Sequence, residues 1–257
     1  FLGYLDVPFQ HGRTLGEVVA WATRNLAVDL VAADFSEEAA NSAEASSGET
    51  SSAASGSTSS VRPPFVPPSP GLPAPEAVAL YPGLVLLEGT NLNEGRGTTL
   101  PFQLLGAPWL DGYRLAAQLN DLALPGLLFR PLTYLPRSDT HAGQLCSGVQ
   151  LLVTDRSLLR PLEAVVRILR HVRQEFPAEF AWVEAASRPW ADLPGAGEPW
   201  HEPVTGYLVD ALVGDDSVRE VVEGSLSLSA AQAAWAETAV AWARDYRRFA
   251  ARRPHRV

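Results

Sequence analysis

Residues 88–99, EGTNLNEGRGTT, bring together the side-chain types that could do chemistry in this chain. Two carboxylates, two amides, three hydroxyls and one guanidinium fall within twelve residues, together with three glycines that allow tight turns. A few convergent polar groups directly after an apolar run are typical of a ligand-binding site. The glycines match neither a Walker loop nor a dinucleotide fingerprint, so a phosphate or nucleotide site is not indicated.

Glu88 and Glu94 are candidates for the two carboxylates that glycoside hydrolysis usually needs. One would act as the acid and the other as base or nucleophile, at a separation of roughly 5–10 Å. A structural alternative is that Glu88 pairs with Arg96 and fixes the loop. Arg96 is then either that clamp or a residue that binds a substrate carboxylate through two hydrogen bonds. The sequence leaves both interpretations open.

Three further residues are candidates for substrate binding. Trp109 could stack on a sugar face, although a half-buried core tryptophan is the commoner outcome. His11, next to a glycine and just before a helix start, could cap or pack there, or approach another group. His141 lies in the loop of residues 136–143 and could face the same cleft. No HExxH pattern or similar pairing occurs, so metal catalysis has little support and we expect no metal.

Cys146 is the only cysteine, which excludes an internal disulfide and any multi-cysteine metal site. It stands at the entrance to an apolar strand, where a buried and inert thiol is the commoner outcome. With His141 it is also the one loose candidate pair for an amidase or esterase, which needs a nucleophile and a base in proximity.

The composition excludes some classes of partner. A net charge of −9 argues against nucleic acid, which requires clustered positive charge. No apolar run approaches the roughly 18–20 residues of a membrane span, so we expect a soluble protein. The chain begins at Phe1 and contains no methionine, and we expect it to be a fragment or mature piece that lacks an N-terminal portion.

The first part of the chain has a distinct organisation. Thr14 and Glu17 form a capping box that predicts a helix to about Leu26, and a short strand is expected at residues 28–32. Residues 35–61 are rich in Ser, Ala and acidic side chains, without periodicity, and are expected to be a disordered insert. A proline-rich stretch then leads into residues 62–257.

The remaining pattern predicts an α/β or α+β fold, with a mixed sheet of short strands flanked by helices and a helical C-terminal third. The expected strands are residues 127–135 and 149–154, both buried; the expected helices are residues 111–123, 158–175, 207–213, 218–223 and a long helix opened by a capping box at 229–232. Trp235, Ala239, Trp242, Tyr246 and Phe249 form one stripe of that helix, which we interpret as core packing.

Several stretches, in order over most of the chain, resemble the exo-β-N-acetylmuramidases of the NamZ type, long catalogued as YbbC-like proteins. The matching stretches are residues 7–17 (VPFQHGRTLGE), 66–70 (VPPSP), 81–83 (YPG), 87–99 (LEGTNLNEGRGTT), 101–104 (PFQL), 106–109 (GAPW) and 148–155 (GVQLLVTD). Together they are much more specific than any single motif.

The resemblance implies an enzyme that removes N-acetylmuramic acid from the non-reducing end of peptidoglycan fragments such as MurNAc-GlcNAc, without a cofactor. It implies a cleft between an upstream Rossmann-like domain, which is missing here, and a C-terminal ancillary domain. Residues 1–34 would end the N-terminal or interdomain segment, and residues 62–257 would be the ancillary domain. The family's candidate catalytic glutamate lies in a GPEHG motif of the first domain, which does not occur here, so this chain could be inactive alone.

By motif, the resemblance assigns His11, Glu88, Thr90, Asn91, Glu94 and Arg96 to the wall of the cleft. The lactyl carboxylate of muramic acid would give Arg96 a ligand. A non-catalytic carbohydrate-binding or scaffolding domain is the alternative, because the missing motif would equally produce it. A cell-wall substrate favours an extracytoplasmic location, although turnover fragments are also imported, so localisation stays open.

Overall fold

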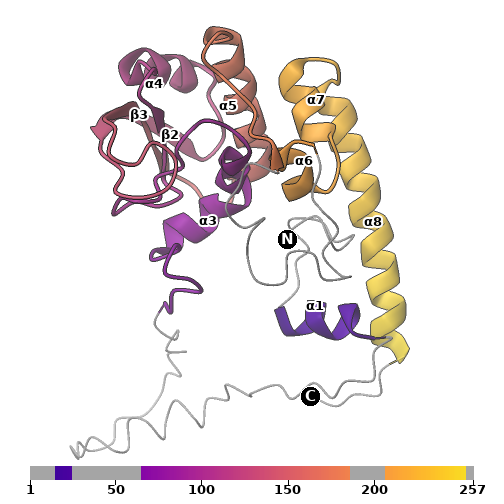
Figure 1. The fold of residues 1–257 in the computed structure, drawn as a ribbon. Coiled ribbons are helices and arrows are strands. Elements are labelled where there is room, and N and C mark those ends of the chain that lie inside the picture. The colour runs from indigo at the N-terminus through magenta and orange to yellow at the C-terminus, as the bar shows by residue number, and fades with distance from the viewer. Residues whose placement is uncertain (1–14, 25–64, 186–205, 253–257) are drawn as a thin grey trace, which may run out of the picture. The chain divides into compact units, whose positions relative to one another are not determined.

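A computed structural model of the chain describes residues 15–24, 65–185 and 206–252 (Figure 1). These fall into two compact units. The larger contains the described residues from Phe65 to Arg244, and the smaller contains residues 15–24 and the last turns of the final helix. His11, the expected strand at 28–32 and the insert at 35–61 lie outside the described residues. The domain boundaries expected from the sequence therefore stay predictions.

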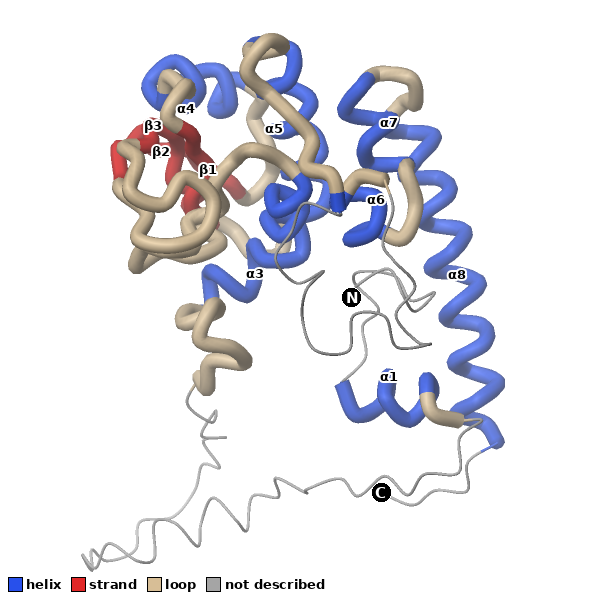
Figure 2. The backbone as a smooth tube through the Cα atoms, viewed as in Figure 1, coloured by secondary structure: helices blue, strands red, loops and turns tan. Residues whose placement is uncertain are grey.

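The larger unit is built on a three-stranded antiparallel sheet with the order β1-β3-β2 (Figure 2). Its strands are β1 (Leu104–Ala107), β2 (Leu127–Tyr134) and β3 (Cys146–Val153). With the surrounding helices this confirms the expected α+β fold, although the sheet is antiparallel throughout and not mixed as expected. β1 was missed because four residues are too few to show a period. β3 begins at Cys146, earlier than predicted, because its first residues pair with both neighbours.

β2 lies at one edge of the sheet, and the expectation that it is buried is wrong. Only Phe129 of its side chains is buried. On the side away from β3, the Asn120 side chain donates to the Phe129 carbonyl oxygen at 2.8 Å and accepts from the Phe129 amide at 2.9 Å. Two residues further, Pro131 has no N–H. The outer side of β2 is therefore occupied by a side chain and a proline.

Helices cover the sheet and lead into the site. They are α3 (Pro75–Leu84), the 3₁₀ helix η1 (Val85–Gly89), α4 (Gly112–Asp121) and α5 (Pro161–Glu175). α4 begins where the Asp111 carboxylate accepts hydrogen bonds from two backbone amides of the first turn. Leu115 and Leu119 of α4 are buried. The helix ends at Asp121, two residues before the expected end at 123, and Leu122 beyond it is 43% exposed.

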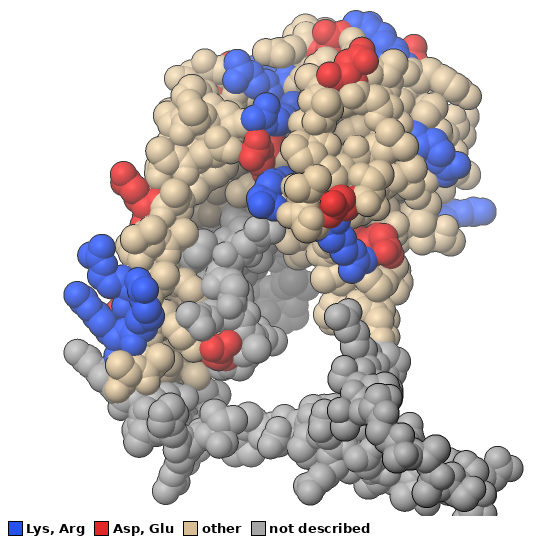
Figure 3. All heavy atoms as spheres, turned by 180° about the vertical axis from the view of Figure 1, so that it is seen from behind, with Lys and Arg blue, Asp and Glu red and all other residues tan. Residues whose placement is uncertain are grey.

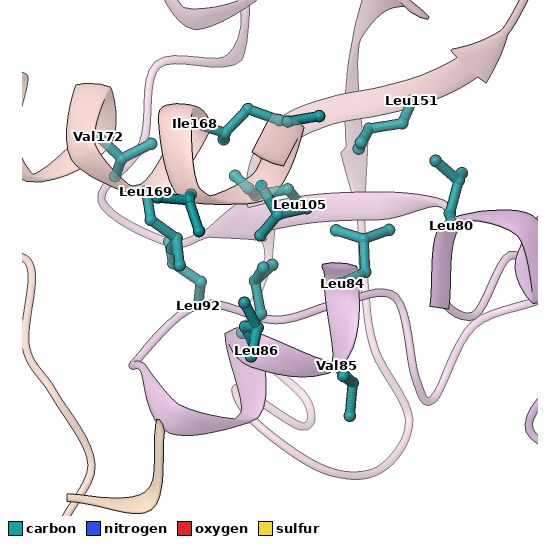
Figure 4. Close-up of a cluster of buried hydrophobic side chains, with 14 of the residues drawn as sticks. Leu80, Leu84, Val85, Leu86, Leu92, Leu105, Leu151, Ile168, Leu169 and Val172 are labelled. Atoms are coloured by element: carbon teal, nitrogen blue, oxygen red, sulfur yellow. The ribbon is translucent and has the colours of Figure 1, made fainter. Parts of the chain in front are cut away.

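The core of the larger unit joins α3, η1, β1 and α5. Figure 4 shows Leu84, Leu86, Leu105, Ile168 and Leu169 pointing toward one another, and all five are fully buried. Burying one such side chain contributes about 1.5–3 kcal/mol. Leu84, just before η1, and Leu86, within η1, are both part of this core. The core therefore also fixes the backbone at the start of the polar segment, residues 88–99.

Three helices complete the chain, as expected: α6 (Leu208–Val213), α7 (Ser217–Glu223) and α8 (Leu228–Arg252). The capping box expected at residues 229–232 is wrong by two positions. α8 starts at Leu228, and the Ser227 hydroxyl accepts a hydrogen bond from the Ala230 amide at 3.1 Å. The stripe from Trp235 to Phe249 is buried or half-buried, which supports its interpretation as packing.

In the smaller unit, α1 (Leu15–Ala22) ends earlier than expected, with a turn at Thr23 and Arg24. Trp21 Nε1 donates to Asp245 at 2.8 Å. Arginine side chains gather where α8 ends (Figure 3), and Arg244, Arg247 and Arg248 are exposed there. Among the described residues, no helix is both long and apolar enough to cross a membrane.

Candidate functional site

A single guanidinium gathers the acidic side chains of the candidate site. Arg96 Nε donates a hydrogen bond to Glu94 Oε1, and Arg96 Nη2 lies 3.3 Å from Glu88 Oε1. The third side-chain nitrogen of Arg96, Nη1, lies 3.6 Å from Asp139 Oδ1. Asp139 belongs to the loop between β2 and β3. Each nitrogen of Arg96 therefore faces a carboxylate. The structure brings Glu88, Glu94 and Arg96 together, as the sequence suggested, and adds Asp139.

These carboxylates differ in their access to solvent. The Glu94 side chain is 0% exposed, whereas the side chains of Glu88, Arg96 and Asp139 are 11%, 27% and 32% exposed. Glu94 Oε2 has no hydrogen-bond partner among the described residues. Its charge is therefore balanced mainly by Arg96, and breaking a buried pair of this kind typically costs about 3–5 kcal/mol.

The electrostatics of Arg96 agree with this geometry. Burial alone would lower the pKa of Arg96, but Glu94, Glu88 and Asp139 together outweigh burial and raise it. Arg96 is therefore a permanent cation in the middle of the cluster. Within the described residues, no group of His, Cys, Asp and Glu side chains has an arrangement that could hold a metal ion.

Two aromatic side chains line one side of the cluster. Arg96 Cζ lies 5.9 Å from the ring centroid of Phe102, within range of a cation–π contact. Phe102 in turn packs edge-to-face against Tyr81, with ring centroids 4.9 Å apart. Burial raises the pKa of Tyr81 and so does nearby Glu88, against a smaller opposing effect of Arg96. The Tyr81 hydroxyl is therefore protonated near neutral pH and is able to donate a hydrogen bond.

Backbone and side-chain bonds tie residues 88–99 to the loop between β2 and β3. The Asn93 amide donates to the Thr140 carbonyl oxygen at 2.9 Å. The Arg137 amide donates to the Gly97 carbonyl oxygen at 2.8 Å. Gly97 has a φ of +78°, and a Cβ there would lie 2.5 Å from Ser138 O. The close approach of the two loops thus requires glycine at this position.

Two residues assigned to substrate binding have structural partners. Buried Thr90 donates its hydroxyl to Leu87 O at 2.8 Å and accepts from the Leu92 amide at 3.2 Å. The Asn91 side chain donates to Glu179 O at 2.7 Å and accepts from the Ala181 amide at 3.0 Å. These contacts fix the loop and occupy one donor and one acceptor site of each side chain, so the assignment of Thr90 and Asn91 to substrate binding stays a prediction.

The other candidates lie in different surroundings. Trp109 is half-buried and packs on Phe176, with ring centroids 5.7 Å apart. This agrees with a tryptophan of the core, the alternative to stacking on a sugar. His141 has a φ of +63°, and its Nε2 lies 2.8 Å from Asn91 O, so His141 joins the two loops. His11 lies outside the described residues.

Cys146 is fully buried, and burial raises the pKa of its thiol to about 11. A thiol with such a pKa holds almost no thiolate near neutral pH, and the thiolate is the nucleophile. This speaks against the amidase or esterase interpretation, in which Cys146 would attack a carbonyl with His141 as its base.

Sequence reasoning missed four residues of the cluster and its supports: Tyr81, Asn93, Phe102 and Asp139. Tyr81 and Phe102 stand in stretches that resemble the family, which was a usable signal. Asp139 carried no such signal, because only the tie between the two loops brings it to Arg96.

The fold and the site define a class of protein: an α+β domain that presents a carboxylate cluster organised by one arginine. Residues 79–251 match the family model described as exo-beta-N-acetylmuramidase NamZ, C-terminal. The chain belongs to this family.

Individual relatives agree with the family match. The chain is 34% identical over 187 residues to the peptidoglycan beta-N-acetylmuramidase NamZ of Bacillus subtilis strain 168, covering 73% of this chain and 42% of that protein. A DUF1343 family protein of Bacteroides fragilis NCTC 9343 shares the fold, with a TM-score of 0.54 and 22% identity over 72% of this chain and 44% of its own. The chain thus spans less than half the length of these relatives.

Proposed function

We propose that the chain is the C-terminal part of an exo-acting glycosidase that removes N-acetylmuramic acid from the non-reducing end of peptidoglycan fragments. The observation that carries the proposal is the Glu88–Arg96–Glu94 cluster, which lies inside the segment that matches the family. The name of the Bacillus subtilis relative, a peptidoglycan beta-N-acetylmuramidase, supports the substrate class. Such a substrate would favour an extracytoplasmic location.

Within this function, burial divides the roles of the two glutamates. The Glu88 side chain is mostly buried but keeps 11% of its surface exposed, and it lies beside Arg96 and near Tyr81, so it is the glutamate of the two that a bound sugar can reach. Glu94 is fully buried behind Arg96, so it acts as a positioning residue that holds the guanidinium. The remaining catalytic group would then come from the upstream Rossmann-like domain of the same protein.

The decisive experiment measures release of N-acetylmuramic acid from a chromogenic β-N-acetylmuramide. The assay uses this chain alone and the protein extended by the coding sequence that precedes residue 1. We expect activity in the longer form and at least a hundredfold loss in its Glu88→Gln variant, as for the removal of a group that acts in the transition state. Glu163→Gln is the matched control, because Glu163 lies on the surface of α5 and, within the described ranges, pairs with Arg167 alone.

A non-catalytic carbohydrate-binding domain is the second candidate. It is favoured by one observation: Glu94 is buried, so Glu88 has no second accessible glutamate beside it in the cluster. If neither form released N-acetylmuramic acid, while the longer form bound the sugar with an affinity that Glu88→Gln weakened, the binding function would replace the glycosidase.

A further inference from the structure

The charge around Arg96 bears on which part of a substrate it can bind. One guanidinium stands among three carboxylates, Glu88, Glu94 and Asp139, so the cluster has a formal charge of +1 − 3 = −2. The positive charge of Arg96 is therefore more than balanced by its own partners, which leaves Arg96 little net attraction for a substrate carboxylate. Neutral sugar hydroxyls, by contrast, can donate hydrogen bonds to the exposed parts of Glu88 and Asp139.

Arg96 is also held in place by Glu94. Glu94 is fully buried, and its Oε2 has no partner among the described residues. If Arg96 turned toward a ligand, a buried carboxylate would lose its counter-charge, which is strongly unfavourable. Arg96 is therefore a positioning residue for the carboxylates.

A different arginine, Arg137, lies on the loop between β2 and β3, and its side chain has no hydrogen bond or ion pair with the described residues. The backbone amide of Arg137 donates a hydrogen bond, 2.8 Å long, to the carbonyl oxygen of Gly97, the residue that follows Arg96 in the chain. The Arg137 side chain is exposed. Some described arginines of the larger unit have no side-chain hydrogen bond or ion pair in the described part of the structure: Arg137, Arg170, Arg173 and Arg244. Of these, Arg170 and Arg173 lie on α5 and Arg244 on α8, whereas Arg137 lies on the loop that is bonded to residues 88–99.

We propose that Arg137, rather than Arg96, receives the lactyl carboxylate of the substrate, while the Glu88–Arg96–Asp139 wall binds neutral groups of the sugar. This inference rests on the proposed function. A guanidinium without other partners can bind a carboxylate through two parallel hydrogen bonds. Arg96 could do so only by giving up its hydrogen bond to Glu94. Arg137 would then set the preference for muramic acid over the same sugar without a carboxylate.

The test compares N-acetylmuramic acid with its uncharged methyl ester as competitive inhibitors of the longer, active protein. We expect Arg137→Gln to weaken inhibition by the acid about tenfold and to change inhibition by the ester less than twofold. Arg96→Lys should weaken both inhibitors to the same extent. Arg156→Gln is the control, because Arg156 is exposed and pairs only with Glu76.

Equal effects of Arg137→Gln on the acid and the ester would overturn the inference, as would a selective loss of the acid in Arg96→Lys. Because Arg137 is exposed, its variant is expected to fold, so a failure of Arg96→Lys to fold would leave the Arg137 comparison decisive. A wild-type protein that released no N-acetylmuramic acid and bound neither compound would overturn the proposed function as well. An active wild type with an unselective Arg137→Gln would overturn this inference alone.

Discussion

The side-chain amide of Asn93 donates a hydrogen bond to the carbonyl oxygen of Thr140, 2.9 Å away on the loop between β2 and β3. Asn93 is fully buried, and its Oδ1 accepts from the Gly95 amide at 2.9 Å. One side chain thus shapes the polar segment and holds against it the loop that carries Asp139.

Replacing Asn93 by alanine should therefore destabilise the protein by about 2–3 kcal/mol, because three side-chain hydrogen bonds are lost and the buried Gly95 amide loses its acceptor. Urea denaturation measures this change in the free energy of unfolding. Gln174→Ala, at an exposed position of α5, should stay within about 0.5 kcal/mol of wild type. A cost below about 1 kcal/mol for Asn93→Ala would mean that the loops are joined by other contacts.

Removing the charge of Arg96 alone should destabilise the protein more than removing the charges of both Arg96 and Glu94. Arg96→Met leaves Glu94 buried without a counter-charge and should destabilise by about 3–5 kcal/mol. Adding Glu94→Gln to that variant should restore part of the stability, because the buried group is then neutral. Chemical denaturation of both single variants and the double variant measures the coupling. Simple addition of the two single costs would contradict this account.

Two glycines with nearly the same backbone angle should respond differently to alanine. Gly97 and Gly143 have φ values of +78° and +75°, but a Cβ on Gly97 would lie 2.5 Å from Ser138 O, whereas Gly143 has no atom within 4 Å. Gly143→Ala should cost only the conformational strain, about 1 kcal/mol. Gly97→Ala must also move the neighbouring backbone and should cost at least about 2 kcal/mol more. Equal shifts in Tm would show that the loops separate easily.

Cys146 should make stability depend on alkaline pH. Burial raises the pKa of the folded thiol from 9.0 to about 11, so the folded state keeps its proton where the unfolded state has lost it. The resulting stability is complete below about pH 9 and is lost as the pH rises toward 11, amounting to about 2 kcal/mol. The difference in unfolding free energy between wild type and Cys146→Ala isolates this effect. A difference that is constant from pH 8 to 11 would contradict it.

The sequence predicted the helices and the polar segment well because both leave local signals. The apolar spacing of α5 and the charged and glycine-rich run at residues 88–99 are visible without any tertiary contact. The pairing of Glu88 with Arg96 was one of the two interpretations that the sequence left open, because the two residues are close in the chain.

What the sequence could not predict depends on contacts between distant segments. Asp139 reaches Arg96 only because Asn93 and Gly97 bind the loop between β2 and β3. β2 resembles a buried strand in its apolar residues, yet at the edge of the sheet only Phe129 is buried and most of the others are half-buried. The polar atoms of Thr90 and Asn91 suggested a ligand, and each side chain also bonds backbone groups that the sequence did not indicate.

The outer side of β2 has a consequence for how the protein behaves at high concentration. An unpaired strand edge offers a row of amides and carbonyls to a strand of another molecule, and such edge-to-edge association leads to aggregation. Here the Asn120 side chain already satisfies both backbone groups of Phe129, and Pro131 offers no amide at the next outward position. An incoming strand would find no two consecutive outward amides to bind, so the Asn120 side chain of α4 and Pro131 together protect β2 from intermolecular sheet extension.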